Sequence, residues 1–241
     1  MKKVLAVLAV VGLMAAATSV SALSIKNTKH DLSSTSGGTQ FKSNNTTQIC
    51  VFCHTPHNSV TSGAQGGSYP LWNRTNPAAG GFDLYSSGSM DNTYNTGAPG
   101  YASDGFTTDS VSLYCMSCHD GVTSLGAVKN PPLDATAGIT FPASPGDKIT
   151  GDANLGTNSL MDDHPVNFGI VNGKDPEIGT VTVNKINTGR LTNSLPLYKS
   201  VRNADATLEC ASCHAVHNNE EGMFLRTTMT GSLLCLGCHI K

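Results

Sequence analysis

The chain repeats one five-residue pattern four times: a cysteine, any two residues, a second cysteine and a histidine. The copies use all eight cysteines of the chain, which are Cys50, Cys53, Cys115, Cys118, Cys210, Cys213, Cys235 and Cys238. The histidines that close the four copies are His54, His119, His214 and His239. In this pattern the two thiols bond covalently to a haem, and the adjacent imidazole is its first iron ligand. The sequence therefore predicts four covalently bound haem c groups.

Paired cysteines have two other common uses, disulfide bonds and zinc sites. An even number of cysteines in an exported chain is typical of a disulfide framework. Repeated Cys-x-x-Cys units are typical of a zinc ribbon. Neither use explains why a histidine directly follows the second cysteine of every pair, because only 8 of 241 residues are histidine. The pattern therefore favours haem attachment.

The number of histidines matches the number of axial positions. Four irons with two axial positions each need eight ligands, and the chain has eight histidines. The four that lie outside the motifs are the candidate second ligands: His30, His57, His164 and His217. This match favours bis-histidine ligation of every haem. Methionine is the competing second ligand, and Met90, Met161, Met223 and Met229 keep that alternative open.

His57 and His217 each follow a motif histidine by three positions. Residues with this spacing project from the same side of a helical turn, whereas the two ligands of one iron approach from opposite faces. We therefore expect His57 to bind the haem of the second motif and His217 that of the fourth. His164 then serves the first motif and His30 the third. The alternative gives His30 to the first motif and His164 to the third.

Residues 1–22 have the pattern of a secretory signal peptide. Lys2 and Lys3 precede an apolar run that ends in the small residues Val20-Ser21-Ala22. The run is too short for a transmembrane helix, so no membrane span is expected. The mature chain, residues 23–241, is predicted to be a single tetrahaem domain. Export would place it outside the cell or at the cell surface, with the periplasm as the alternative.

The composition predicts little regular structure. Charged residues make up 13% of the chain, aromatic residues 6%, and 25 residues are glycine, which is unusual for a globular domain. We expect mostly coil with short α-helices at the haem motifs, organised by a haem stack. A minor β-hairpin is predicted in residues 178–191, where β-branched and polar residues alternate around a turn.

The charge balance argues against nucleic acid as a partner. Without Lys2 and Lys3 the chain has 13 basic and 17 acidic residues. A nucleic-acid-binding domain would instead carry a basic patch.

The order of ligands carries a family resemblance. An early histidine, His30, is followed by Cys-x-x-Cys-His-Thr-Pro-His at 50–57, the isolated His164-Pro165 and Cys-x-x-Cys-His-x-x-His at 210–217. This order resembles the polymerising multihaem outer-surface c-type cytochromes of the OmcE and OmcS type, and the haem count is closest to OmcE. The resemblance implies an extracellular filament, mostly coil, with a continuous haem chain. It also implies that His30 ligates a haem of the neighbouring subunit, here the third.

Three functions remain open from the sequence. The first is an electron carrier, not an enzyme, that forms a conducting filament and passes electrons to redox partner proteins or extracellular acceptors. The second is a discrete periplasmic tetrahaem shuttle. The third is a multihaem reductase, which needs one iron with an open position. Four standard motifs, and enough histidines to close every iron, favour a carrier over an enzyme.

Overall fold

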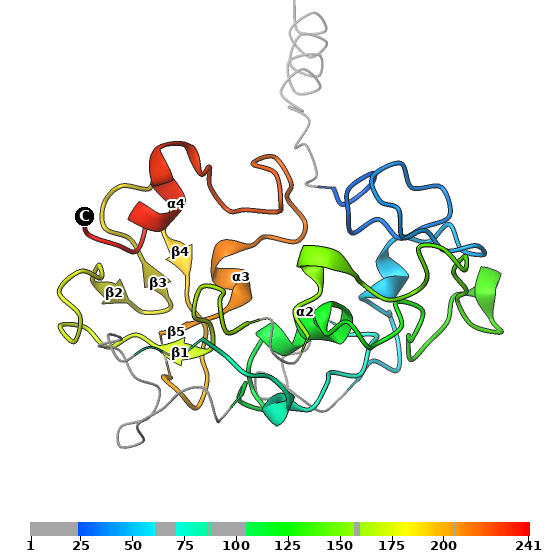
Figure 1. The fold of residues 1–241 in the computed structure, drawn as a ribbon, viewed down its shortest axis with the longest axis horizontal. Helices are drawn as coiled ribbons and strands as arrows, with labels where there is room; N and C mark the ends of the chain where they lie inside the picture. The colour runs from blue at the N-terminus through cyan, green and yellow to red at the C-terminus, as the bar shows by residue number, and fades with distance from the viewer. Residues whose placement is uncertain (1–23, 61–70, 86, 88–104, 157–159, 205) are drawn as a thin grey trace, which may run out of the picture.

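The computed structural model describes residues 24–60, 71–85, 87, 105–156, 160–204 and 206–241. The signal peptide predicted at residues 1–22 lies outside the described residues and stays a prediction. Within the described part coil predominates and every helix is short (Figure 1), as the sequence predicts. None of the helices in these ranges has the length and apolar character needed to cross a membrane.

Each motif coincides with helical structure, which confirms the expectation of short helices at these positions. The four elements are η1 (Cys50–Phe52), α2 (Ser112–His119), α3 (Cys210–Cys213) and α4 (Leu233–Leu236). They follow one another from right to left across Figure 1, from the cyan turn of η1 to red α4. The remaining helical turns are η3 (Ala79–Gly81), η4 (Leu133–Ala135), η5 (Gly151–Ala153) and η6 (Thr230–Ser232).

The strands are only two residues long and form two small antiparallel sheets. Strands β2 (Val181–Thr182) and β3 (Lys185–Ile186) form the hairpin predicted within residues 178–191, and β4 (Leu195–Pro196) joins them as a third strand. A second sheet pairs β1 (Phe168–Gly169) with β5 (Thr207–Leu208). No sequence pattern predicts strands β1, β4 or β5. Strand β5 leads directly into α3, so this sheet positions the third motif.

Two clusters of buried apolar side chains lie on either side of α2. The larger includes Met116 of α2 and residues from every strand region, and Cys238 packs against it. The smaller is built around Val51 and Phe52 of η1, and Cys118 packs against it. Helix α2 therefore joins the part of the molecule that holds the first motif to the part that holds the last two.

Candidate functional site

Each motif folds into one tight turn. In the first, third and fourth motifs, the backbone N–H of the histidine donates to the carbonyl of the first cysteine. The three N···O distances are 2.8 Å for His54, 3.0 Å for His214 and 2.9 Å for His239. In the second motif α2 spans both cysteines and the histidine. This turn gathers two sulfurs and one imidazole, the three groups that hold a haem c.

Consecutive motifs are neighbours in space through their cysteines. Burial raises the pKa of the Cys53 thiol to about 12, and the nearby Cys118 raises it further. A hydrogen bond to Cys210 raises the pKa of Cys115 well above its usual value. In the same way Cys213 adds to the effect of burial, which raises the pKa of Cys238 to about 12. The first motif therefore adjoins the second, the second the third, and the third the fourth.

Three pairs of histidine rings lie close together at similar centroid distances. The ring centroids are 6.2 Å apart for His30 and His119, with an interplanar angle of 73°. They are 6.1 Å apart for His54 and His217, at 40°. For His164 and His239 the distance is 6.3 Å and the angle 74°. Each pair joins one motif histidine to one histidine outside the motifs.

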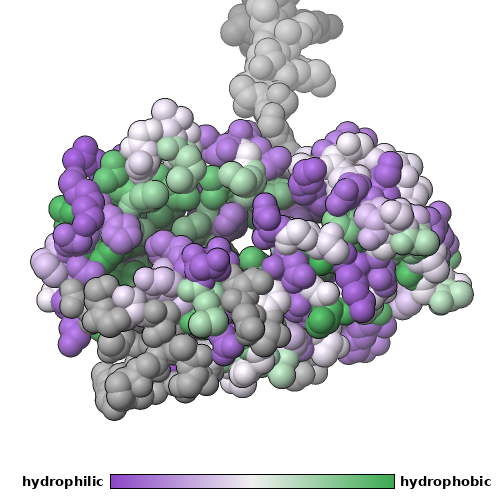
Figure 2. Space-filling view, in the orientation of Figure 1, coloured by the Kyte–Doolittle hydropathy of each residue, from purple (hydrophilic) through white to green (hydrophobic). Residues whose placement is uncertain are grey.

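This spacing fits a shared iron. A metal–imidazole bond is about 2.0 Å long, and the ring centroid lies about 1.2 Å behind the nitrogen, so two rings across one metal have centroids about 6.4 Å apart. Stacked rings are closer, as His30 and Phe224 are at 4.2 Å, whereas edge-to-face rings reach the same distance without a metal, as Phe52 and Phe141 do at 6.2 Å. Figure 2 shows apolar surface set back behind a hydrophilic rim on this face. The residues present therefore fit axially ligated haem c.

Three histidines are oriented by backbone carbonyls. Nδ1 of His119 lies 2.7 Å from the carbonyl oxygen of Ala153, and Nδ1 of His214 lies 2.9 Å from that of Met223. Nδ1 of His164 is 2.9 Å from the oxygen of Pro165. A carbonyl only accepts, so Nδ1 carries the proton and Nε2 keeps its lone pair. Metal-binding histidines are usually oriented in this way.

His30 is held within its own chain. Its ring stacks on Phe224, with centroids 4.2 Å apart and an angle of 10°, and it also hydrogen bonds to the backbone of Val216. Burial lowers the pKa of His30 to about 4, and the nearby His119 and His214 lower it further. The imidazole is therefore neutral at ordinary pH, which is the form that binds a metal.

The ring pairs differ from the pairs predicted from sequence. His30 faces the second motif of its own chain, whereas the prediction gave it to the third motif of a neighbour. His217 faces the first motif and His164 the fourth. The rule that a histidine three positions on does not face its own motif's histidine agrees with His217. The assignment of His217 to the nearest downstream motif does not agree, because the chain folds back and brings the His217 ring to His54 of the first motif.

Two histidines remain after these three pairs, His57 and His214. Both are exposed, and in the described part of the chain neither ring faces another histidine ring at the spacing of the three pairs. The predicted pairing of His57 with the second motif is therefore not seen, because His30 lies there. Of the competing methionines, Met161, Met223 and Met229 are exposed at 50%, 74% and 49%, and Met90 lies outside the described residues.

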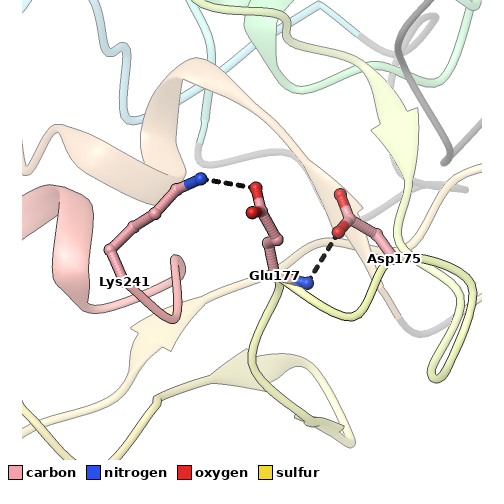
Figure 3. A network of polar contacts seen from close by, with 3 residues as sticks. All are labelled: Asp175, Glu177 and Lys241. Carbon is pink, nitrogen blue, oxygen red and sulfur yellow. Dashed lines mark hydrogen bonds and ion pairs between the residues drawn. The ribbon is translucent and has the colours of Figure 1, made fainter.

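The fourth motif is fixed by the segment around β2 and β3. Ile178 and His239 form a β-bridge, and the N–H groups of Gly179 and Ile240 donate to Cys238 and Glu177, both at 2.7 Å. Figure 3 shows the side chains beside this bridge. Lys241 Nζ lies 2.5 Å from Glu177 Oε2, and Asp175 accepts from the N–H of Glu177 at 2.8 Å.

Sequence reasoning missed two charged side chains beside the motifs. Arg74 and Glu209 are both completely buried. Arg74 lies in a glycine- and asparagine-rich stretch without any pattern. Glu209 directly precedes Cys210, and it forms a capping box with Ser212 at the start of α3. The acid before the third motif was a usable signal; nothing in the sequence distinguishes Arg74.

Comparison with known proteins identifies the last two motifs. None of the curated proteins matches the chain. The family model for the doubled CXXCH motif matches residues 203–241, which hold the third and fourth motifs. With eight cysteines in four such pairs, the chain carries the covalent attachment sites of a multihaem c-type cytochrome, consistent with four haems.

Proposed function

We propose that this chain is an electron carrier and the subunit of an extracellular filament, in which a histidine of one subunit completes a haem site of the next. The observation that carries the proposal is the three histidine pairs within one chain, which leave His57 and His214 as the remaining ligands. Haem c supplies one-electron oxidation and reduction at its iron.

The residues of this chain would attach the haems and close their irons to small molecules. The cysteine pairs fix each attachment site, and neighbouring motifs touch through the sulfurs of Cys115 and Cys210. In the proposed holoprotein, pairs of imidazoles would hold the irons of the first, second and fourth motifs from both sides, which would leave a small substrate no free position there. Closed sites in contact favour a carrier over a reductase.

The contact between subunits is proposed at the third motif. His214 has its Nδ1 oriented by Met223, as a ligand requires, yet no histidine of its own chain faces it among the described residues. His57 is exposed and lies five residues after η1, in the segment of the first motif. His57 of one subunit can therefore serve His214 of the next, a head-to-tail contact of the kind that builds a filament when its rotation does not close into a ring. In this proposal His57 takes the role of intersubunit ligand that the sequence analysis gave to His30, because His30 lies beside His119 of its own chain.

The second candidate function rests on the same observation. If no neighbour covers the third site, its iron keeps an open position, as a multihaem reductase requires. A discrete periplasmic shuttle is the remaining alternative. It predicts a fully closed monomer, so all three functions can be separated by one set of measurements.

Electron microscopy of the secreted protein, together with electron paramagnetic resonance, tests the proposal. We expect filaments whose irons are all low-spin, and a dispersed monomer with one high-spin iron in four. The variant His57→Ala should lose filaments and keep four haems by intact mass. Added imidazole should return its open iron to low spin without restoring filaments. Filaments from His57→Ala would overturn the assignment of His57; a wild-type monomer that is already fully low-spin would support the shuttle.

Export is part of the proposal. The secreted protein should begin at Leu23 if residues 1–22 are removed. N-terminal sequencing of the extracellular and periplasmic fractions tests both the cleavage position and the final compartment.

A further inference from the structure

Two completely buried charged side chains, one of each sign, lie where neighbouring motifs meet. They are Arg74 and Glu209, each with a relative exposure of 0%. Charged residues are almost never fully buried unless they are paired. These two are not paired with each other, since each has its own set of hydrogen-bond partners. Neither has a part in the ligation described above.

Arg74 is held between the first and second motifs. Its Nε and Nη2 donate to the carbonyl of Ser117, at 3.2 and 2.8 Å, and Ser117 lies between the cysteines of the second motif. The preceding residue, Asn73, donates its backbone N–H to the carbonyl of Cys53 in the first motif at 2.9 Å. The positive charge is therefore fixed beside both attachment sites.

The partners of Arg74 do not neutralise it. Besides Ser117, its guanidinium donates to the carbonyls of Leu125 and Ser124, both at 2.8 Å. Every one of these acceptors is an uncharged backbone oxygen. The charge is nevertheless felt at both motifs, because Arg74 opposes the rise that burial causes in the thiol pKa of Cys53 and Cys118.

Glu209 occupies the equivalent place between the second and third motifs. Its Oε2 accepts from the hydroxyls of Ser110 at 2.7 Å and Ser112 at 2.5 Å, and its Oε1 accepts from Asn167 at 2.9 Å. Ser112 also accepts the backbone N–H of Cys210 at 3.0 Å. Burial raises the pKa of Glu209, and the donors around its carboxylate oppose that rise, so the group is negatively charged above this raised pKa. This negative charge acts on Cys115 and Cys210, the two sulfurs in contact.

We propose that Arg74 and Glu209 set the reduction potentials of the neighbouring haems in opposite directions, highest at the first motif and lowest at the third. A haem that takes up an electron gains one negative charge, so a fixed positive charge stabilises the reduced form and a carboxylate opposes it. Electrons would therefore pass from the haem of the third motif, which is oxidised, to the haem of the first motif, which is reduced. The second site lies beside both charges and takes an intermediate value.

Burial makes these two charges effective. A charge in the interior acts through a low effective dielectric, whereas water screens exposed charges. Arg226, near the third motif, is exposed and donates to the carbonyl of Ala211, so its charge is screened. The buried pair therefore dominates the difference between the first and the third motif.

Potentiometric titration of the holoprotein, with each haem resolved by the paramagnetic NMR shifts of its methyl groups, tests the inference. Arg74→Gln should lower the potential at the first and second motifs. Arg74→Lys keeps the charge and should move them much less. Glu209→Gln should raise the potential at the second and third. We expect about a tenfold change in the reduced-to-oxidised ratio at fixed potential, equivalent to about 59 mV for one electron.

The controls remove a charge of the same kind from the surface. Arg190→Gln and Glu220→Gln alter exposed residues and should leave all potentials unchanged. Equal shifts from Arg74→Lys and Arg74→Gln, or equal shifts at all four haems, would overturn the inference. Should Arg74→Gln fail to fold, Glu209→Gln alone decides it, because the predicted sign is opposite.

The inference rests on the proposed function, but the two can fail separately. Intact mass and the low-spin spectrum are measured first on every variant. Fewer than four haems in the wild type would contradict the proposed function. Four haems with unshifted potentials would contradict only the role of Arg74 and Glu209.

Discussion

The two segments with the pattern Cys-x-x-Cys-His-x-x-His, residues 50–57 and 210–217, have the same ligands at the same spacing and different surroundings. The ring of His217 faces His54 at 6.1 Å. His57, its counterpart, is exposed and faces no histidine ring in the described part of the chain. The local spacing argues that the last histidine of each segment does not share an iron with the motif histidine three positions before it. The path of the rest of the chain decides which other motif it serves.

The residues before and after the two segments differ as well. Residues 50–57 begin after Ile49, which makes no side-chain cap, whereas residues 210–217 follow the buried Glu209 with its capping box. After His217 the chain makes a turn in which Met223 and Phe224 both have positive φ, 46° and 57°. Such angles are unfavourable for residues other than glycine. This turn brings the Met223 carbonyl to His214 and the Phe224 ring to His30.

The largest difference is expected when the two outer histidines are removed one at a time. His217→Ala should open the first site within the monomer, so two irons in four become high-spin instead of one. His57→Ala should leave the monomer spectrum unchanged, because this residue faces no motif of its own chain. Electron paramagnetic resonance of dilute protein measures both. Identical monomer spectra for the two variants would contradict the asymmetry.

Loss of the Phe224 ring, which follows residues 210–217, should have the next largest effect. Phe224 is 7% exposed and stacks on His30, so Phe224→Ala should lower the free energy of unfolding by about 3 kcal/mol. It should also weaken low-spin ligation at the second motif, because His30 loses its support. Denaturant unfolding and carbon monoxide binding measure the two effects. Phe41→Ala, in a partly buried ring of the other core cluster, is the control and should leave the haem spectrum intact.

Glu209, which directly precedes residues 210–217, should make the free energy of unfolding depend on pH. Burial raises the pKa of Glu209, so the folded protein binds this proton more tightly than the unfolded chain. The resulting stability is complete below the unfolded-state pKa and is lost as pH rises through the folded-state pKa. The free energy of unfolding of the wild type, relative to Glu209→Gln, should therefore fall as the pH rises from the unfolded-state pKa through the raised folded-state pKa of Glu209. A difference that does not change with pH would contradict this.

The smallest effect is expected at the loop after the first segment. Asn130 donates to the carbonyl of Asn58 at 2.9 Å and to Asn73 Oδ1 at 3.2 Å. Asn130→Ala should cost about 1 kcal/mol of folding free energy and reduce filament yield without changing the monomer spectrum. Unfolding curves and electron microscopy measure this. Asn218→Ala, at the position after His217 that corresponds to Asn58, should leave filament yield unchanged.

The sequence predicts what depends on local chemistry. The four motif turns, the coil-rich fold and the hairpin near β2 and β3 follow from Cys-x-x-Cys-His and from the alternation in residues 178–191. The ring pairs do not follow, because each joins residues from distant parts of the chain and depends on how β5 and α2 position the third motif. Arg74 could not be predicted either, since its position between Cys53 and Ser117 is created only by folding.

The three histidine pairs also act as cross-links in the proposed holoprotein. They join residues 30 to 119, 54 to 217 and 164 to 239, so each loop overlaps the next and together they enclose nearly the whole described chain. Closing long loops restricts the unfolded ensemble, as disulfides do in many small secreted proteins. Here every cysteine belongs to a motif, and iron–imidazole bonds take over that restraint. Such bonds can break and re-form, so the chain gains the entropy benefit of cross-linking while remaining able to correct a misfolded pairing.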